Sequence, residues 1–257
     1  MIICHSKKFV FIKGRKIAST SIEVALSGFC QSIDILTPMT PIDDVLRYQR
    51  TGLTAQNYGA DEKKIEKYRN KIISFVSKAP EDWSAIRKPR GEYNGHMAFK
   101  DIEQVHGEFS KDWMVIAICR NPYEQALSRI KHMASKAAIQ QRSSDVLDVQ
   151  SVELEAAKKK FCRKAKEKSL CLNIDLYKDK FGKMRPTFIL RYEKLNDDFL
   201  TLSKLLGNAS PLPLTHLKKS KTSEHLDPEK FFREDEIRMI NECFNEEFVE
   251  FGYDKLE

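Results

Sequence analysis

Residues 9–29 read FVFIKGRKIASTSIEVALSGF, and their pattern is the clearest indication of the fold. The apolar β-formers at 9–12 predict a short buried strand, and the polar residues 13–16 and small residues 18–21 that follow predict a loop. Apolar residues then recur at helical spacing at Ile22, Ala25, Leu26 and Phe29. The order is therefore buried strand, polar loop and helix.

The same order recurs around MVIAIC at 114–119, a second apolar segment too short for a helix and typical of a buried strand. Asn121 is a predicted helix cap, Pro122 suits the first helical position, and Glu124 stands where a capping box would close. The spacing predicts a helix from Pro122 to about Met133.

A third strand is predicted at 187–191, with a helix at 195–206, and an apolar stripe near the C-terminus predicts a helix that Gly252 ends. Strands alternating with helices indicate an α/β fold with a P-loop-like, mostly parallel central sheet flanked by helices. We expect one domain over residues 1–257, with helical insertions at 38–90 and 136–180. The stripe consists of Ile237, Ile240, Phe244, Phe248 and Phe251.

The charge is unevenly distributed along the 257 residues, a length that excludes a small disulfide scaffold. The chain has 44 Lys and Arg against 37 Asp and Glu, a net of +7. Residues 158–168, KKKFCRKAKEK, carry seven basic residues and one acid, or +6, so the rest nets about +1. This pattern does not predict a nucleic-acid partner. It leaves two alternatives for 158–168: a solvated helix face, or a patch that attracts an acidic acceptor.

The six cysteines are scattered, with no CxxC pair and no histidine at zinc-ligand spacing. The sequence therefore predicts reduced thiols and neither a metal site nor a redox pair. Since no apolar segment approaches 18 residues, it also predicts no membrane span and a cytoplasmic location.

The loop Lys16-Ile17-Ala18-Ser19-Thr20-Ser21 is the first candidate site. Small residues let backbone N–H groups at a helix N-terminus face an anion, with the Thr20 and Ser21 hydroxyls as further donors and Lys16 as a cation. This arrangement suits a phosphate or a sulfate. The alternative is an ordinary capped helix start with an exposed lysine. The loop is not a Walker A motif, because GxxxxGK[ST] is absent.

Arg120, at the carboxyl end of the second strand, and Ser128, eight residues later, form a second candidate phosphate site. The alternatives are a structural ion pair for Arg120 and a hydrogen bond from Ser128 to the carbonyl of Glu124.

His96, in the segment GHMAF at 95–99, is a candidate general base, and the alternative is a packed or surface histidine. Arg191 and Tyr192 follow the third strand and are candidate ligand contacts. The alternative is that this segment is only a strand end followed by a helix cap.

Taken together, these motifs resemble the sulfotransferases that use 3′-phosphoadenosine 5′-phosphosulfate (PAPS). KIASTS at 16–21 is similar to the family's phosphosulfate-binding loop, RNPYEQALS at 120–128 to its 3′-phosphate motif, and GHMAF to the base-histidine segment of the carbohydrate 2-O-sulfotransferase-like branch. LRYEKL at 190–195 and FGYD at 251–254 resemble later segments. Arg15 and Ile17 depart from the usual proline and threonine.

The resemblance implies that His96 is the base, that Lys16 stabilises the leaving phosphate, and that PAPS becomes adenosine 3′,5′-bisphosphate without a metal. It implies a hydroxyl-bearing acceptor, for which a carbohydrate is the first candidate and a small alcohol the second. Residues 38–90 and 136–180 would determine the specificity for the acceptor. A nucleotide kinase and a non-catalytic polyanion binder remain the alternatives. The implied cofactor contacts are Arg15, Lys16, Ala18, Ser19, Thr20, Ser21, Arg120, Ser128, Arg191 and Tyr192.

Overall fold

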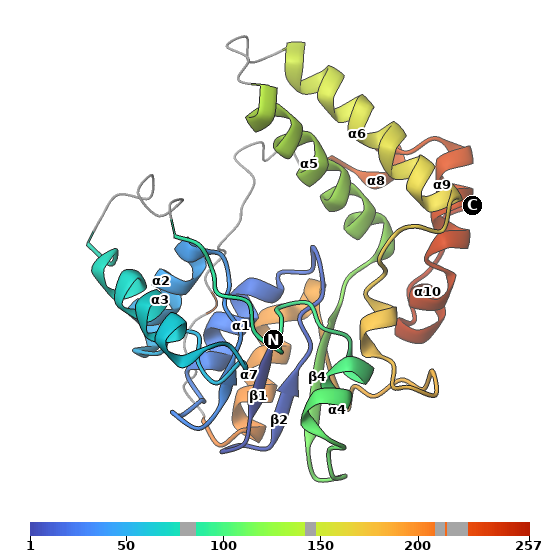
Figure 1. Cartoon of the computed structure of the whole chain (residues 1–257). Helices are drawn as coiled ribbons and strands as arrows, with labels where there is room; N and C mark the ends of the chain where they lie inside the picture. The colour runs from blue at the N-terminus through green and yellow to red at the C-terminus, as the bar shows by residue number, and fades with distance from the viewer. Residues whose placement is uncertain (78–85, 142–147, 209–213, 215–225) are drawn as a thin grey trace. The chain divides into compact units, whose positions relative to one another are not determined.

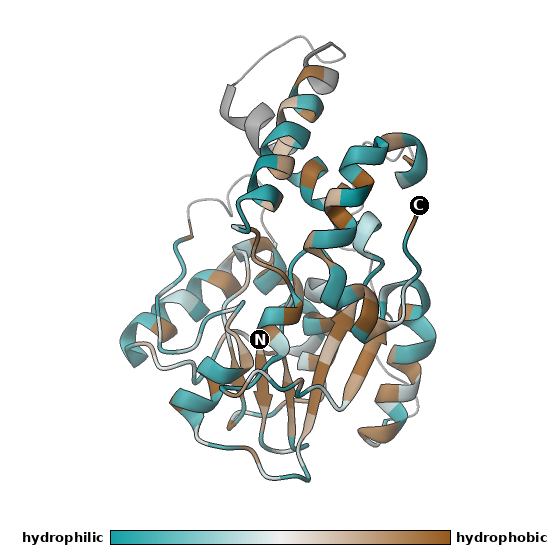
Figure 2. Ribbon diagram, turned by 90° about the vertical axis from the view of Figure 1, so that its right-hand side faces the viewer, coloured by the Kyte–Doolittle hydropathy of each residue, from teal (hydrophilic) through white to brown (hydrophobic). Residues whose placement is uncertain are grey.

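The computed structural model describes residues 1–77, 86–141, 148–208, 214 and 226–257. Its described strands form one five-stranded sheet in the order β3-β1-β2-β4-β5. Figure 2 shows these strands as largely hydrophobic. The strands are β1 (Ile2–Cys4), β2 (Phe9–Phe11), β3 (Ile35–Leu36), β4 (Met114–Cys119) and β5 (Phe188–Arg191).

The sheet is mixed, so the prediction of a mostly parallel sheet was wrong. β1 pairs antiparallel with both β2 and β3, whereas β2 pairs parallel with β4, with Val10 opposite Val115. Only residues 5–8 join β1 to β2, and so short a connection permits antiparallel pairing but not a parallel crossover. Lys8 has a φ of 51° in this turn.

The chain divides into two compact units, each built from two separated stretches. The first unit comprises Met1–Ile118 and Asp175–Lys219, and the second comprises Cys119–Ile174 and Ser220–Glu257. A single sulfotransferase domain stays a prediction.

The helices of the first unit flank the sheet and extend from it (Figure 1). Its α2 begins with Pro41 in the first turn and ends at Gly52, whose φ is 72°, which is the usual placement of these two residues. α2 and α3 lie in the predicted insertion 38–90 and confirm its helical character. The helices are α1 (Ser19–Ser27), α2 (Pro41–Thr51), α3 (Glu62–Ser74), α4 (Phe99–His106) and α7 (Leu195–Leu205), with the 3-10 turn η3 (Tyr192–Lys194).

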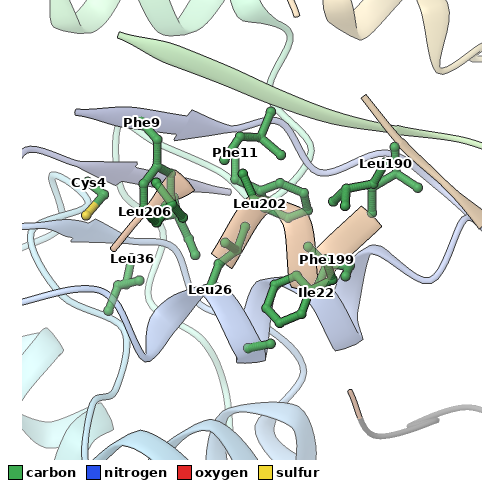
Figure 3. Close-up of a cluster of buried hydrophobic side chains, with 14 of the residues drawn as sticks. Cys4, Phe9, Phe11, Ile22, Leu26, Leu36, Leu190, Phe199, Leu202 and Leu206 are labelled. Carbon is green, nitrogen blue, oxygen red and sulfur yellow. The ribbon is translucent and has the colours of Figure 1, made fainter. Parts of the chain in front are cut away.

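The core of the first unit lies between one face of the sheet and the helices α1 and α7. Figure 3 shows Phe9 and Phe11 of β2 facing Leu26 of α1 and Phe199 and Leu202 of α7, and all five are buried. Each fully buried side chain of this size contributes about 1.5–3 kcal/mol. The predicted strand, loop and helix of residues 9–29 and the predicted strand and helix of 187–206 are confirmed.

The second unit is helical. Its core joins α5, α6 and the C-terminal helices around the side chains Phe161, Ile240, Phe244 and Phe248. The predicted apolar stripe is confirmed, but it spans two helices that meet at Phe244. Gly252, with a φ of 63°, caps the second of them, as predicted. The helices are α5 (Pro122–Gln141), α6 (Asp148–Lys166), α8 (Pro228–Phe231), α9 (Glu234–Cys243) and α10 (Asn245–Phe251); the 3-10 turn η2 (Ile174–Tyr177) crosses from the second unit to the first.

The basic segment 158–168 lies on and just beyond α6, and it is not uniformly solvated. Lys159 and Lys160 are exposed. Lys158 is buried, and its Nζ lies 2.7 Å from both a Glu236 carboxylate oxygen and the Phe231 carbonyl oxygen. A solvated face is therefore the wrong interpretation for Lys158. Within the described ranges, no helix is both long and apolar enough to span a bilayer.

Candidate functional site

The loop between β2 and α1 has an unusual backbone. Lys16 and Ala18 have φ values of 64° and 59°, in the left-handed region that side chains other than glycine rarely adopt. Each such residue costs about 1–3 kcal/mol and persists where surrounding contacts enforce it, often at ligand sites. The loop therefore holds a strained shape that an ordinary strand-to-helix connection does not need.

The N-terminus of α1 is open to an anion. Ala18 is the N-cap residue, and no side chain within the described residues caps this helix end or places an acid in its first turn. The hydroxyl of Ser19 donates to the Gly14 carbonyl at 2.6 Å and so closes the loop. This is not the capped helix start that Ser and Thr usually make, and the first N–H groups give this end partial positive charge.

The candidate residues of the loop differ in exposure. Arg15 is exposed, Ser19 is buried, and Lys16, Ala18, Thr20 and Ser21 are half-buried. Ile17 is fully buried in the apolar core, which fixes the middle of the loop while Lys16 stays at its surface. Ile17 thus anchors the loop by packing.

His96 contacts this loop. Its Nδ1 lies 2.8 Å from the carbonyl oxygen of Lys13, a residue 83 positions earlier. Because a carbonyl can only accept, Nδ1 carries the proton, and Nε2 then has the free lone pair that a general base needs. Burial lowers the pKa of His96 to about 4, and the nearby charges of Lys13 and Arg15 act in the same direction. The imidazole is therefore neutral near pH 7.

The segment that bears His96 is held by backbone contacts. The Asn94 side-chain oxygen accepts the His96 N–H at 3.2 Å, and the Tyr93 N–H donates to the Tyr58 carbonyl at 3.1 Å. Gly91 lies against that carbonyl so closely that a Cβ there would be 2.2 Å from the oxygen. The segment thus has little freedom to move the imidazole.

Lys13 and Glu23 are residues of this site that the sequence analysis missed. The Lys13 ammonium and a Glu23 carboxylate oxygen are 2.5 Å apart, and both side chains are buried. The other oxygen of Glu23 accepts from the amino group of Met1. Burial alone would raise the pKa of Glu23, but these cations lower it to about 2. Two features of the sequence could have indicated this pair. Glu23 is the single acid within an apolar helix, and Lys13 directly follows a buried strand.

Replacing Glu23 with glutamine is expected to lower the free energy of unfolding by about 3–5 kcal/mol, because the buried Lys13 ammonium loses its counter-charge. Urea unfolding of both proteins measures this difference. The double variant Lys13→Met with Glu23→Leu removes both members of this pair and should recover part of the loss, but not all of it, because the Met1 amino group still loses its acceptor. A loss below about 1 kcal/mol for Glu23→Gln would show that the pair does not hold the loop.

The third group of candidates lies at the start of α5. Arg120 and Asn121 directly precede this helix, and Ser128 lies within it. The Asn121 side chain accepts the N–H groups of Tyr123 at 3.0 Å and Glu124 at 3.4 Å, which confirms the predicted cap. Arg120 Nη2 donates to Glu124 at 2.9 Å, so the ion pair considered for Arg120 is present. Within the described residues, Ser128 does not make the hydrogen bond to Glu124 that was considered as its alternative role. Its side chain is half-buried.

Arg191 and Tyr192 lie where β5 ends and η3 begins, in the first unit. The Arg191 backbone N–H donates to an Asp198 carboxylate oxygen at 2.7 Å, which ties the strand end to α7. The Arg191 side chain is half-buried, and Tyr192 is 37% exposed. The strand end considered in the sequence analysis is thus present, and a ligand role for these two residues stays a prediction.

Two surface hollows in the described part of the first unit lie elsewhere, against α3 and α4. Neither is lined by the loop or by His96. The candidate site therefore consists of the loop backbone and its contact with His96. An anion site at a helix end needs N–H donors and does not need a deep pocket.

Comparisons with known proteins give one structural likeness. No known family model matches the chain, and no curated protein matches it. Among solved structures, the chain is similar to a sulfotransferase from Alicyclobacillus acidocaldarius, with 14% sequence identity, 96% of each chain covered and a TM-score of 0.35.

Proposed function

We propose that this protein is a sulfotransferase that moves a sulfuryl group from PAPS to an acceptor hydroxyl. The observation that carries the proposal is the 2.8 Å contact between His96 Nδ1 and the Lys13 carbonyl. It brings the candidate base to Lys13, three residues before the candidate phosphosulfate loop 16–21, although the two motifs are far apart in the sequence. It also leaves Nε2 as the proton acceptor.

The loop residues suit the donor's 5′-phosphosulfate. The backbone N–H groups at 18–21 and the Thr20 and Ser21 hydroxyls would hold its phosphate at the uncapped end of α1, and Arg15 would add positive charge. The motif resemblance assigns the 3′-phosphate to Arg120 and Ser128, and a further contact to Arg191 and Tyr192. PAPS supplies an activated sulfuryl group on a phosphate that leaves readily.

The chain's own groups then have separate tasks. His96 Nε2 takes the proton of the acceptor hydroxyl, so that the oxygen can form its bond to sulfur. Lys16 places a positive charge where negative charge grows on the bridging oxygen of the leaving phosphate. Transfer of this kind depends mainly on positioning and electrostatics, as phosphoryl transfer does.

A nucleotide kinase is the weaker proposal, because the loop lacks the GK[ST] residues that hold phosphate and magnesium. For the acceptor we propose a carbohydrate hydroxyl first and a small alcohol second. The acceptor residues would lie in the insertions 38–90 and 136–180, parts of which, 78–85 and 142–147, are outside the described residues.

The direct test is incubation of the chain with PAPS and a panel of glycans and small alcohols, followed by mass spectrometry. We expect one acceptor class to gain the mass of a sulfuryl group as adenosine 3′,5′-bisphosphate forms in equal amount. No transfer to any acceptor, with ATP-dependent gain of a phosphoryl group instead, would overturn the proposal in favour of a kinase.

The exposed lysines of α6 give a test of acceptor charge. If an anionic glycan is the acceptor, changing Lys159 and Lys160 to glutamate should raise its Michaelis constant about threefold to tenfold at low salt and leave kcat unchanged. Lys158→Glu is unsuitable as part of this test, since it would place an acid against Glu236 in the core. An unchanged Michaelis constant would show that this helix face only solubilises the protein.

A further inference from the structure

Two cysteines and an aspartate that are well separated in the sequence meet at one place in the first unit. Cys4 ends β1, Cys30 follows α1, and Asp34 precedes β3; their Sγ and carboxylate atoms all lie within 4.8 Å of one another. Cys4 Sγ is 3.4 Å from Asp34 Oδ2. Figure 3 shows Cys4 at the margin of the apolar cluster. Cys4 and Asp34 are buried, while Cys30 is half-buried.

The size of this cluster matches a tetrahedral zinc site. With Zn–S bonds of about 2.3 Å and Zn–O bonds of about 2.1 Å, tetrahedral angles place a sulfur and an oxygen ligand about 3.6 Å apart and two sulfur ligands about 3.8 Å apart. The observed separations are 3.4 Å for one sulfur and oxygen, and no more than 4.8 Å for any pair. Small rotations of the side chains would therefore be enough to bind the ion.

We propose that Cys4, Cys30 and Asp34 bind one zinc-class divalent cation through two thiolates and a carboxylate. Binding releases the two thiol protons to solvent and leaves the oxidation state of sulfur and metal unchanged. The fourth position is taken by water or by the Ser6 hydroxyl, whose oxygen is 3.3 Å from Cys4 Sγ. Two thiolates favour zinc-class ions over magnesium or calcium.

The carboxylate is already oriented. Asp34 Oδ1 accepts the N–H groups of His5 at 2.7 Å and Ser6 at 3.1 Å, and Oδ2 accepts the Gln31 N–H at 2.7 Å. Such outer contacts fix ligands in metal sites and typically control affinity about 10- to 100-fold.

The cation would have a structural role. It would tie the end of β1 to the segment after α1 and to the start of β3, at the opposite end of α1 from the loop that bears Lys16. The inference therefore stands whether or not the protein transfers sulfuryl groups. It also explains why two cysteines without a CxxC spacing lie together.

The test uses the full chain with reduced thiols, titrated with Co²⁺ and Zn²⁺ against a chromophoric chelator. We expect one equivalent of metal per chain and thiolate-to-cobalt charge-transfer absorption. Cys30→Ser, which changes a half-buried atom and spares the core, should weaken binding by about a hundredfold or more. The matched control is Cys171→Ser, an exposed cysteine of the second unit, which should bind as the parent does. Equal binding by Cys30→Ser would overturn the proposal.

A second measurement needs no variant. Zinc should protect two thiols of the parent chain from alkylation, and peptide mapping should identify them as Cys4 and Cys30. Alkylation of both at the same rate with and without zinc would overturn the site. So would a chain that retains no zinc, is lighter by two hydrogen atoms and contains a cross-linked Cys4–Cys30 peptide, because these thiols would then form a disulfide.

Discussion

Replacing Lys16 with alanine is expected to lower the rate of sulfuryl transfer by about a hundredfold to a thousandfold. Lys16 is half-buried and has a left-handed backbone between the buried Ile17 and the exposed Arg15. Removing the Lys16 ammonium takes away charge where the leaving phosphate becomes negative. Initial rates with saturating PAPS measure this effect, since the loss should appear in kcat.

Lys63 of α3 provides the matched control, because it is an exposed lysine of the same unit outside the loop. Lys63→Ala should keep the parent rate. Lys16→Arg retains a charge but spreads it over a planar fork, and we expect it to recover only part of the lost rate. If Lys16→Ala retains more than about a tenth of the parent kcat, Lys16 does not stabilise the leaving phosphate.

Replacing His96 with alanine is expected to lower turnover by about a hundredfold to ten-thousandfold, the usual contribution of a positioned base. Affinity for adenosine 3′,5′-bisphosphate should stay nearly intact, because the imidazole would contact the acceptor and not the nucleotide. Transfer assays and calorimetry with this nucleotide separate the two effects. His132→Ala, a change in an exposed histidine of α5, is the control.

The pH profile of the parent enzyme gives an independent check on His96. Because burial lowers the pKa of His96 to about 4, the imidazole stays neutral, and able to accept a proton, down to about pH 5. The rate should fall only as the pH drops through about 4, not through the ordinary histidine value of about 6.5. An acid limb near 6.5, or full activity of His96→Ala, would mean that another group is the base.

The longer apolar segments were predictable from the sequence, and the short strands were not. Residues 9–12, 114–119 and 187–191 have enough β-formers next to a helical pattern to predict β2, β4 and β5. β1 has three residues, as β2 does, but it is followed by a turn and not by a loop and a helix, and β3 has only two residues. Because the unrecognised β1 is the strand that runs antiparallel to both its neighbours, missing it produced the wrong sheet.

The site was predictable only where a motif identified it. The loop was predicted as an anion site and His96 as a candidate base from the residues, and the resemblance gave them their roles. Periodicity does not reveal that an imidazole nitrogen meets the Lys13 carbonyl 83 residues away. Lys13 and Glu23 resemble solvent-facing charges in sequence, since burial of an ion pair depends on the fold around it. Cys4 and Asp34 meet because β3 pairs with β1 in the sheet. Strands this short are not recognisable in the sequence, so their pairing was not predictable.

We propose above all that the chain binds a nucleotide with separate 3′- and 5′-phosphates. Thermal unfolding with adenosine 3′,5′-bisphosphate, compared with ATP plus magnesium, tests it most directly. We predict stabilisation by the bisphosphate, about 2.7 kcal/mol at a hundredfold excess over its Kd, and none by ATP with magnesium. Stabilisation by ATP with magnesium and none by the bisphosphate would show that the chain is not a PAPS-dependent enzyme.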